Sequence, residues 1–151
     1  MTRETSSLKR VLLVDDDADD RELFEEAVKL VNPSLLIDTA RDGEELMQYI
    51  KNTIPDVIFL DLNMPKKNGK ECLVEIRSDS KFSNIPVIIY TTSLNQVDIA
   101  ETKRNGASYF FRKPNSFDEL KDVLHQILVR NKTMQVAGVE SGFVLNETVP
   151  T

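Results

Sequence analysis

Side chains that can bind metal ions and phosphoryl groups follow four of the apolar runs in this chain. They are Asp15, Asp16 and Asp17 after LLV, Asp61 after VIFL, Thr91 after VIIY and Lys113 after YFFR. In an open parallel α/β sheet, ligands bind outside the carboxyl ends of the strands, so these side chains are expected to meet in one site. Carboxylates without a partner repel one another and favour a hard cation such as Mg²⁺. The lysine then indicates that an anion also binds at the site. A cation and an anion among carboxylates together indicate magnesium and a phosphoryl group.

The composition restricts the class of protein. The chain has 151 residues, enough for one domain with a core, and its net charge of -6 argues against general binding to nucleic acid or to anionic membranes. No apolar run approaches the roughly 20 residues of a membrane span. The polar start MTRETSSLKR has no signal-peptide core, and the single cysteine, Cys72, suits a reducing compartment. A cytoplasmic location is therefore expected.

Five strand-like runs alternate with five helix-like runs. Strands are predicted at 10–14, 35–40, 56–60, 85–90 and 109–112, each followed by a segment of helical periodicity. This alternation predicts a parallel sheet with right-handed crossovers and helices on both faces. The fourth helix, within 95–105, offers little beyond Val97 and Ala100 to a core, which makes it a candidate moving part.

Both ends of the chain differ from its body. Residues 1–8 are predicted to be a flexible arm, 9–131 the folded domain and 132–151 a C-terminal tail. The tail contains the apolar segment GFVLNE, interpreted either as a loose end or as a docking segment. A docking segment would pack on the last helix of its own or a sister chain, or add to a partner's edge strand. In both interpretations it is not part of the core.

Four motifs, LLVDDD, LDLNMPKKNG, PVIIYTTS and GASYFFRKP, occur in this order. Together they resemble the receiver domain of two-component response regulators over about 9–131. The resemblance implies a doubly wound, flavodoxin-like (βα)5 fold with strand order 2-1-3-4-5, which places the first and third strands side by side. The stretches DLNMPKKNGKECLVEIR and TTS resemble single-domain receivers that work with phytochrome-type histidine kinases.

The resemblance also assigns roles to the acidic residues. Asp61 would accept the phosphoryl group, and Asp16 and Asp61 would bind Mg²⁺ or Mn²⁺ directly. The backbone carbonyl of Asn63 would be a third ligand, and Asp15 would act through a metal-bound water. This set leaves room in an octahedral shell for waters and a phosphoryl oxygen.

Further roles fall on residues of the last two strands. Lys113 would bind one phosphoryl oxygen, aimed by a cis bond to Pro114, and the Thr91 hydroxyl would bind another. As Thr91 moves inward, Phe110 would turn into the vacated space. The surface of the fourth helix, fifth strand and fifth helix would then change.

The expected partner is a histidine kinase, including the phytochrome type, or a histidine phosphotransfer protein. The output is expected to be altered protein contacts, because a tail of about 20 residues cannot hold a DNA-binding helix-turn-helix. No enzymatic activity is expected beyond the chain's own phosphorylation and slow autodephosphorylation. A homodimer through the fourth helix, fifth strand and fifth helix, or through the tail, is left open. The resemblance indicates a bacterial signalling protein.

Other interpretations remain open at this point. The aspartates after the first strand could serve only a helix N-terminus, and Asp17 in particular could be an N-cap. A dehalogenase-type phosphohydrolase would need an acid/base aspartate where Asn63 stands, and a flavodoxin would need a Ser/Thr/Gly-rich phosphate loop after the first strand. A receiver that no longer accepts phosphoryl groups is a fourth alternative.

Overall fold

The computed structural model describes residues 8–130 and 142–146. The strands are β1 Arg10–Val14, β2 Leu36–Ala40, β3 Val57–Leu60, β4 Val87–Thr91 and β5 Tyr109–Arg112. The helices are α1 Ala18–Val31, α2 Gly43–Asn52, α3 Gly69–Ser78, α4 Gln96–Arg104 and α5 Phe117–His125, which continues into a π-helical turn, η1 Gln126–Arg130. The predicted arm before Leu8 and the tail at 132–141 and 147–151 lie outside the described residues.

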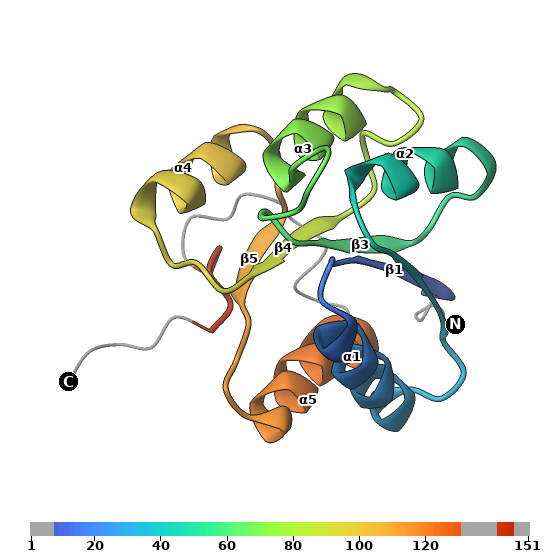
Figure 1. Ribbon diagram of the computed structural model, residues 1–151. Helices are drawn as coiled ribbons and strands as arrows, with labels where there is room; N and C mark the ends of the chain where they lie inside the picture. The colour runs from blue at the N-terminus through green and yellow to red at the C-terminus, as the bar shows by residue number, and fades with distance from the viewer. Residues whose placement is uncertain (1–7, 131–141, 147–151) are drawn as a thin grey trace.

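The five strands form one parallel sheet in the order β2-β1-β3-β4-β5. Helices α1 and α5 cover one face, and α2, α3 and α4 cover the other (Figure 1). The predicted doubly wound (βα)5 fold and its strand order are confirmed. The order reverses between β1 and β3, so the carboxyl ends of these two strands lie side by side.

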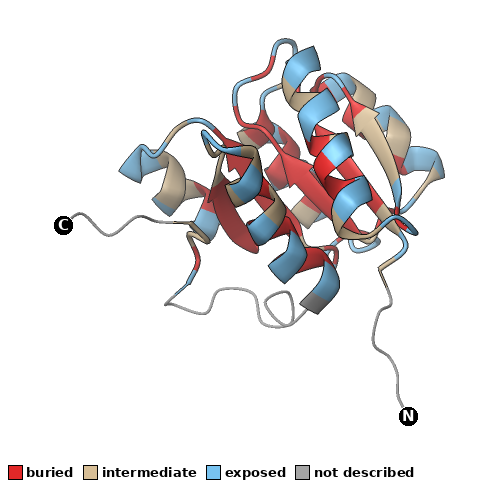
Figure 2. Cartoon of the chain, turned by 90° about the horizontal axis from the view of Figure 1, so that it is seen from below, coloured by how far each residue is buried: buried red, intermediate tan, exposed pale blue. Residues whose placement is uncertain are grey.

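The inner strands are apolar on both faces because helices cover both faces of the sheet. In β1, Leu12 and Val14 pack toward one set of helices, whereas Val11 and Leu13 pack toward the other. Figure 2 shows the buried strands between helices that are exposed on their outer sides. The core therefore holds the strand ends at fixed positions, which a site built from strand ends requires.

Polar side chains fix the first turn of each helix. The N-cap residues are Asp17, Asp42, Asn68, Asn95 and Ser116, and each accepts a hydrogen bond from a backbone N–H of its helix. Asp17 accepts from the Asp20 N–H at 2.9 Å, which settles its role as a cap of α1. In the acidic run after β1, Asp17 therefore caps helix α1, whereas Asp15 and Asp16 stand at the end of the strand.

Helix α4 presents a different face to the core than the sequence predicted. Val97 is 67% exposed and Ala100 is also exposed, whereas Thr102 is fully buried and Ile99 packs against the core. The prediction that Val97 and Ala100 face the core was wrong. In this short helix Val97 and Ile99 are both apolar but lie on different faces, and the face that carries Ile99 is the one that packs on the core. Among the residues of α4 only Thr102 is buried, so its core anchor is small, as expected.

The segment at 142–146 lies along the free edge of β5, beside the sheet in Figure 1. Val144 pairs in parallel with Phe110, and Phe143 is only 4% exposed and belongs to the core cluster. The prediction that GFVLNE is not part of the core was therefore wrong. An edge strand offers unpaired N–H and C=O groups, and this segment satisfies both backbone groups of Phe110.

Candidate metal and phosphoryl site

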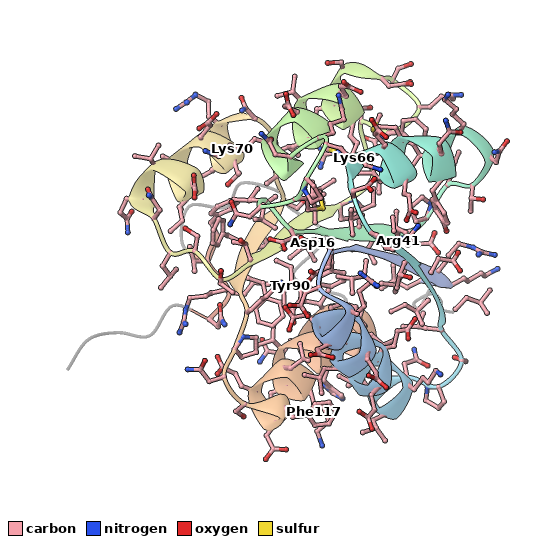
Figure 3. All side chains as sticks on the ribbon, viewed as in Figure 1. Asp16, Arg41, Lys66, Lys70, Tyr90 and Phe117 are labelled. Atoms are coloured by element: carbon pink, nitrogen blue, oxygen red, sulfur yellow. The ribbon has the colours of Figure 1, made fainter. Side chains whose placement is uncertain are left out.

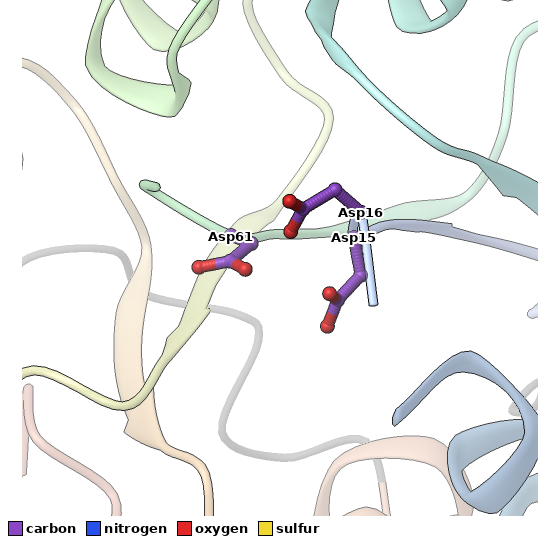
Figure 4. Close-up of side chains that lie close together, drawn as sticks. All are labelled: Asp15, Asp16 and Asp61. Atoms are coloured by element: carbon purple, nitrogen blue, oxygen red, sulfur yellow. The ribbon is translucent and has the colours of Figure 1, made fainter. Parts of the chain in front are cut away.

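The acidic cluster is built where β1 and β3 end. One carboxylate oxygen from each of Asp15, Asp16 and Asp61 lies within 4.8 Å of the others, and Figure 4 shows the three side chains close together. The Asp61 N–H donates to the Val14 carbonyl at 3.0 Å, so the ladder between the two strands continues to the site. Asp15 and Asp61 are buried, whereas Asp16 is exposed. The sequence prediction of an acidic cluster at this edge is confirmed.

Burial sets the electrostatics of Asp15. This side chain is fully buried, and burial raises the pKa of its carboxyl group to about 6 although the nearby Lys113 ammonium acts in the opposite direction. The Asp15 Oδ1 atom accepts a hydrogen bond from the Asp17 N–H at 2.9 Å, which fixes its orientation. A cation that binds beside a buried, oriented carboxylate of this kind stabilises its charged form.

Lys113 reaches from the end of β5 into the cluster. Its Nζ atom lies 2.7 Å from Asp15, 2.8 Å from Asp20 and 3.3 Å from Asp61. Burial alone would lower the pKa of Lys113, but the hydrogen bonds to Asp15 and Asp20 outweigh it and raise the pKa. The ammonium is therefore charged and held at the acids, as a group that binds phosphoryl oxygens must be.

The peptide bond between Lys113 and Pro114 is trans, so the expected cis bond was wrong. Free X-Pro bonds favour trans by about 0.5–1 kcal/mol. With the trans bond Lys113 already contacts Asp15 and Asp61, so the lysine needs no cis bond to reach the acids.

Thr91 ends β4, beside the acidic cluster. Strand β4 pairs with β3 so that Leu60 lies opposite Ile89, which brings Thr91 just beyond the position opposite Asp61. The Thr91 side chain is fully buried, and its hydroxyl has no hydrogen-bond partner within the described part of the chain. A buried hydroxyl without a partner is costly unless a ligand supplies one.

Phe110 is fully buried in this structure, with its ring centroid 6.4 Å from that of Phe143. The aromatic that was expected to turn inward thus already lies inside, covered by the C-terminal segment. The sequence analysis did not predict this contact, because nothing in the segment GFVLNE identifies the strand with which it pairs.

An open cavity of about 400 Å³ adjoins the cluster. Asp16, Asn63, Asn68, Lys70 and Asp98 are among the residues that line it, and Figure 3 labels Asp16 and Lys70. The Asn63 N–H donates to Asp61 Oδ1 at 3.3 Å, so the loop after β3 folds back on the site. The cavity therefore leaves Asp16, the exposed member of the cluster, open on this side.

Charged residues that the sequence analysis did not single out surround this cavity. Lys70 of α3 lies 2.6 Å from Asp98 and 3.0 Å from Glu101, both on α4. Asp98 also accepts a hydrogen bond from the Ser93 hydroxyl at 3.1 Å. These pairs tie α4 and the loop before it to α3. Asp20, one of the aspartates in the first turn of α1, contacts Lys113.

The donor set fits a divalent cation. Three carboxylates meet at one point, and the donors are oxygens, which hard cations such as Mg²⁺ and Mn²⁺ prefer. The cluster also carries more negative charge than Lys113 can balance. Divalent metal binding is the chemistry that this arrangement supports.

A protein-family model, described as the response regulator receiver domain, matches residues 11–125. The chain belongs to the response regulator receiver family. The receiver is 31% identical to the response regulator Rcp1 of Synechocystis sp., over 99% of both chains. Its structure superposes on that of the phosphorylated cyanobacterial phytochrome response regulator RcpA with a TM-score of 0.73 and 30% identity, covering 96% of this chain and all of that one.

A Mn²⁺-bound form of Rcp1 is a second structural relative, with a TM-score of 0.71 and 29% identity over 95% of this receiver and 99% of that chain. Receivers of this family act in two-component signalling, which places the chain among response regulators and not among phosphohydrolases or flavodoxins. The relative with bound Mn²⁺ and the acidic cluster agree on a divalent metal site. None of the described helices is long and apolar enough to cross a membrane.

Proposed function

We propose that this receiver takes a phosphoryl group from a phosphohistidine onto Asp61. The supporting observation is that Asp61 is buried at the end of β3 and lies close to both Lys113 and the two other acids. In the transfer a carboxylate oxygen of Asp61 forms a bond to phosphorus as the bond to the donor imidazole nitrogen breaks. The imidazole keeps the bonding electrons and leaves as a neutral group once protonated.

Asp16, Asp61 and the backbone carbonyl of Asn63 would hold Mg²⁺ or Mn²⁺, with Asp15 acting through water. When bound, the cation screens the repulsion between the carboxylate and the incoming dianion. The chain itself supplies the rest: Lys113 binds one phosphoryl oxygen, and the Thr91 hydroxyl, which has no partner in the described chain, donates a hydrogen bond to another. Phe110 then adjusts to the new position of Thr91 and alters the surface of α4, β5 and α5.

The donor is proposed to be a histidine kinase or phosphotransfer protein, including one of the phytochrome type, because the chain is similar to the phytochrome response regulator RcpA. A cleft beside Lys113 supports this contact, because Asp20, Leu23, Pro114 and Phe117 line it. Leu23 is 46% exposed, which gives a docking helix an apolar anchor next to the acceptor. Such a partner implies a cytoplasmic location.

The output is proposed to be altered protein contacts, with no substrate other than the chain itself. Leu94 and Val97 expose apolar surface beside and on α4. A homodimer through α4, β5 and α5 would cover this surface, as would a downstream protein.

Incubation with acetyl phosphate and Mg²⁺, followed by intact mass measurement, tests the proposal. The wild-type chain should gain one phosphoryl group, and excess EDTA should prevent the gain. Asp61→Asn should gain none, whereas Asp118→Asn, a change at an exposed position on α5, should behave as wild type. Equal labelling of Asp61→Asn and the wild type would refute the proposal.

A further inference from the structure

The segment 143–146 holds β5 through backbone hydrogen bonds that centre on one residue. The Phe110 N–H donates to the Phe143 carbonyl at 2.9 Å, and the Leu145 N–H donates to the Phe110 carbonyl at 2.8 Å. Both backbone groups of Phe110 on the open edge of the sheet are thus used by the segment. The C-terminal segment acts as a short parallel strand on the free edge.

Asn146 extends this pairing with its side chain. Its Oδ1 atom accepts from the Arg112 N–H at 3.1 Å, and its Nδ2 group donates to the Arg112 carbonyl at 2.8 Å and to Glu119 at 3.2 Å. The amide therefore reproduces the pair of bonds that a further strand residue would make with β5. Such a specific set of bonds marks the edge as a strand-binding surface with side-chain selectivity.

Side chains add an anchor at the same place. Phe143 is almost fully buried against Phe110, and the Lys103 ammonium of α4 lies 5.6 Å from the centroid of the Phe143 ring. Leu145 packs on the opposite core cluster, on the side of α5. The segment therefore bridges α4, β5 and α5, the elements expected to change on phosphorylation.

Phe110 also connects the segment to the phosphoryl site. It lies opposite Ile89 of β4, and Thr91 follows two residues later, so Thr91 and Phe110 point to the same face of neighbouring strands. The buried Thr91 hydroxyl has no partner in the described chain, so a phosphoryl oxygen on Asp61 would draw it away from β5. The Phe110 ring can then enter the space that Thr91 leaves, and in doing so it loses its contact with Phe143.

We infer that the edge of β5 is a strand-binding surface occupied by residues 143–146 of the chain itself, and that phosphorylation of Asp61 weakens this occupancy through Thr91 and Phe110. The inference rests on the proposed function. The released edge fits an extended partner segment that runs parallel to β5 and presents an aromatic residue with an asparagine three positions later. The chain's own sequence from Phe143 to Asn146 is the template for that partner.

Amide hydrogen exchange of the full chain tests the coupling, with Mg²⁺ alone and with Mg²⁺ plus beryllium fluoride as the phosphoryl mimic. The Phe110 and Leu145 amides should exchange about ten-fold faster with the mimic, whereas the Ile58 amide, bonded to Pro86 inside the sheet, should not. Thr91→Ala, measured at a mimic concentration that saturates its weakened site, should lack this acceleration. Unchanged or slower exchange of Phe110 and Leu145 in the wild-type chain overturns the inference.

Reciprocity supplies a second readout. If phosphorylation weakens the segment, then Phe143→Ala, which weakens the segment directly, should raise the phosphorylated fraction reached with acetyl phosphate several-fold. An unchanged fraction, with the Phe110 amide already exchanging faster in this variant, overturns the coupling. Absence of any label in the wild-type chain would instead refute the proposed function, so the two failures are distinguishable.

A labelled synthetic peptide of sequence GFVLNE tests the surface itself. It should bind the full wild-type chain in the presence of beryllium fluoride and at least ten-fold more weakly without it. Replacing the phenylalanine of the peptide by alanine should abolish binding. Equal binding with and without the mimic, or none in either state, contradicts the assignment of the β5 edge as a regulated docking surface.

Discussion

The Lys113 ammonium lies 2.7 Å from the Asp15 carboxylate, although β3 and β4 separate their strands in the sheet. Lys113 also lies 3.3 Å from Asp61, so a single side chain neutralises part of the charge of two acids. A divalent cation at the same acids is repelled by this ammonium, and a phosphoryl group is attracted by both. The site is therefore arranged so that the anion and the cation bind more favourably together than either does alone.

Removal of Lys113 should separate these effects. Lys113→Met should bind Mg²⁺ about ten-fold more tightly, because a nearby positive charge is gone. Without Mg²⁺ it should lose about 3 kcal/mol of stability, since the buried Asp15 loses its ion-pair partner. Titration calorimetry and urea unfolding measure the two quantities. Weaker metal binding in the variant would contradict the repulsion between the two cations.

Asp16 should carry much of the metal affinity although it is exposed. Asp16→Ala removes one of the three clustered carboxylates and should weaken Mn²⁺ binding at least ten-fold, as read by electron paramagnetic resonance. Asp19→Ala is the matched control, since it removes a similar exposed charge of α1 that lies outside the cluster. Equal losses in the two variants would show that the acids act only as a diffuse negative field.

The Thr91 hydroxyl, for which the described chain offers no partner, should lower the stability of the unphosphorylated protein. Thr91→Val keeps the side-chain shape and removes a buried polar atom without a partner in the described chain, so unfolding free energy should stay equal or rise by about 1 kcal/mol. The variant should still accept phosphoryl groups from acetyl phosphate. A clear loss of stability in thermal unfolding would show that the hydroxyl has a partner in solution.

The C-terminal segment should contribute to the stability of the fold. Phe143→Ala should lower the free energy of unfolding by about 2 kcal/mol, the value of burying a large apolar side chain. Val97→Ala, at an exposed position of α4, should change it by less than about 0.5 kcal/mol. If urea unfolding gives the same midpoint for Phe143→Ala and the wild type, the segment does not pack on β5 in solution.

The fold and the acidic cluster were predictable because their signals are local. Each buried strand is a short apolar run, and the strand order that the family resemblance implied brings Asp15 and Asp61, which follow β1 and β3, to one edge. Asp17 was ambiguous, because a cap and a metal ligand favour the same residue types. Its hydrogen bond from the Asp20 N–H, which identifies it as the N-cap, is visible only in the structure.

The contacts that were missed are distant in sequence. Val144 pairs with Phe110 across more than thirty residues, and no periodicity in a short apolar segment identifies the strand that it will join. The phase of α4 was missed for a different reason: Val97 and Ile99 are both apolar, and the helix has too few core residues to decide between them from the pattern.

The central claim is that Asp61 accepts the phosphoryl group, and mapping the adduct tests it most directly. The chain is phosphorylated with acetyl phosphate and Mg²⁺, reduced with borohydride to convert the aspartyl phosphate into a stable homoserine, and digested for mass spectrometry. The account predicts that homoserine replaces aspartate at position 61 and at no other aspartate, including Asp15, Asp16 and Asp20. Homoserine at one of those three positions, with Asp61 unmodified, would contradict it.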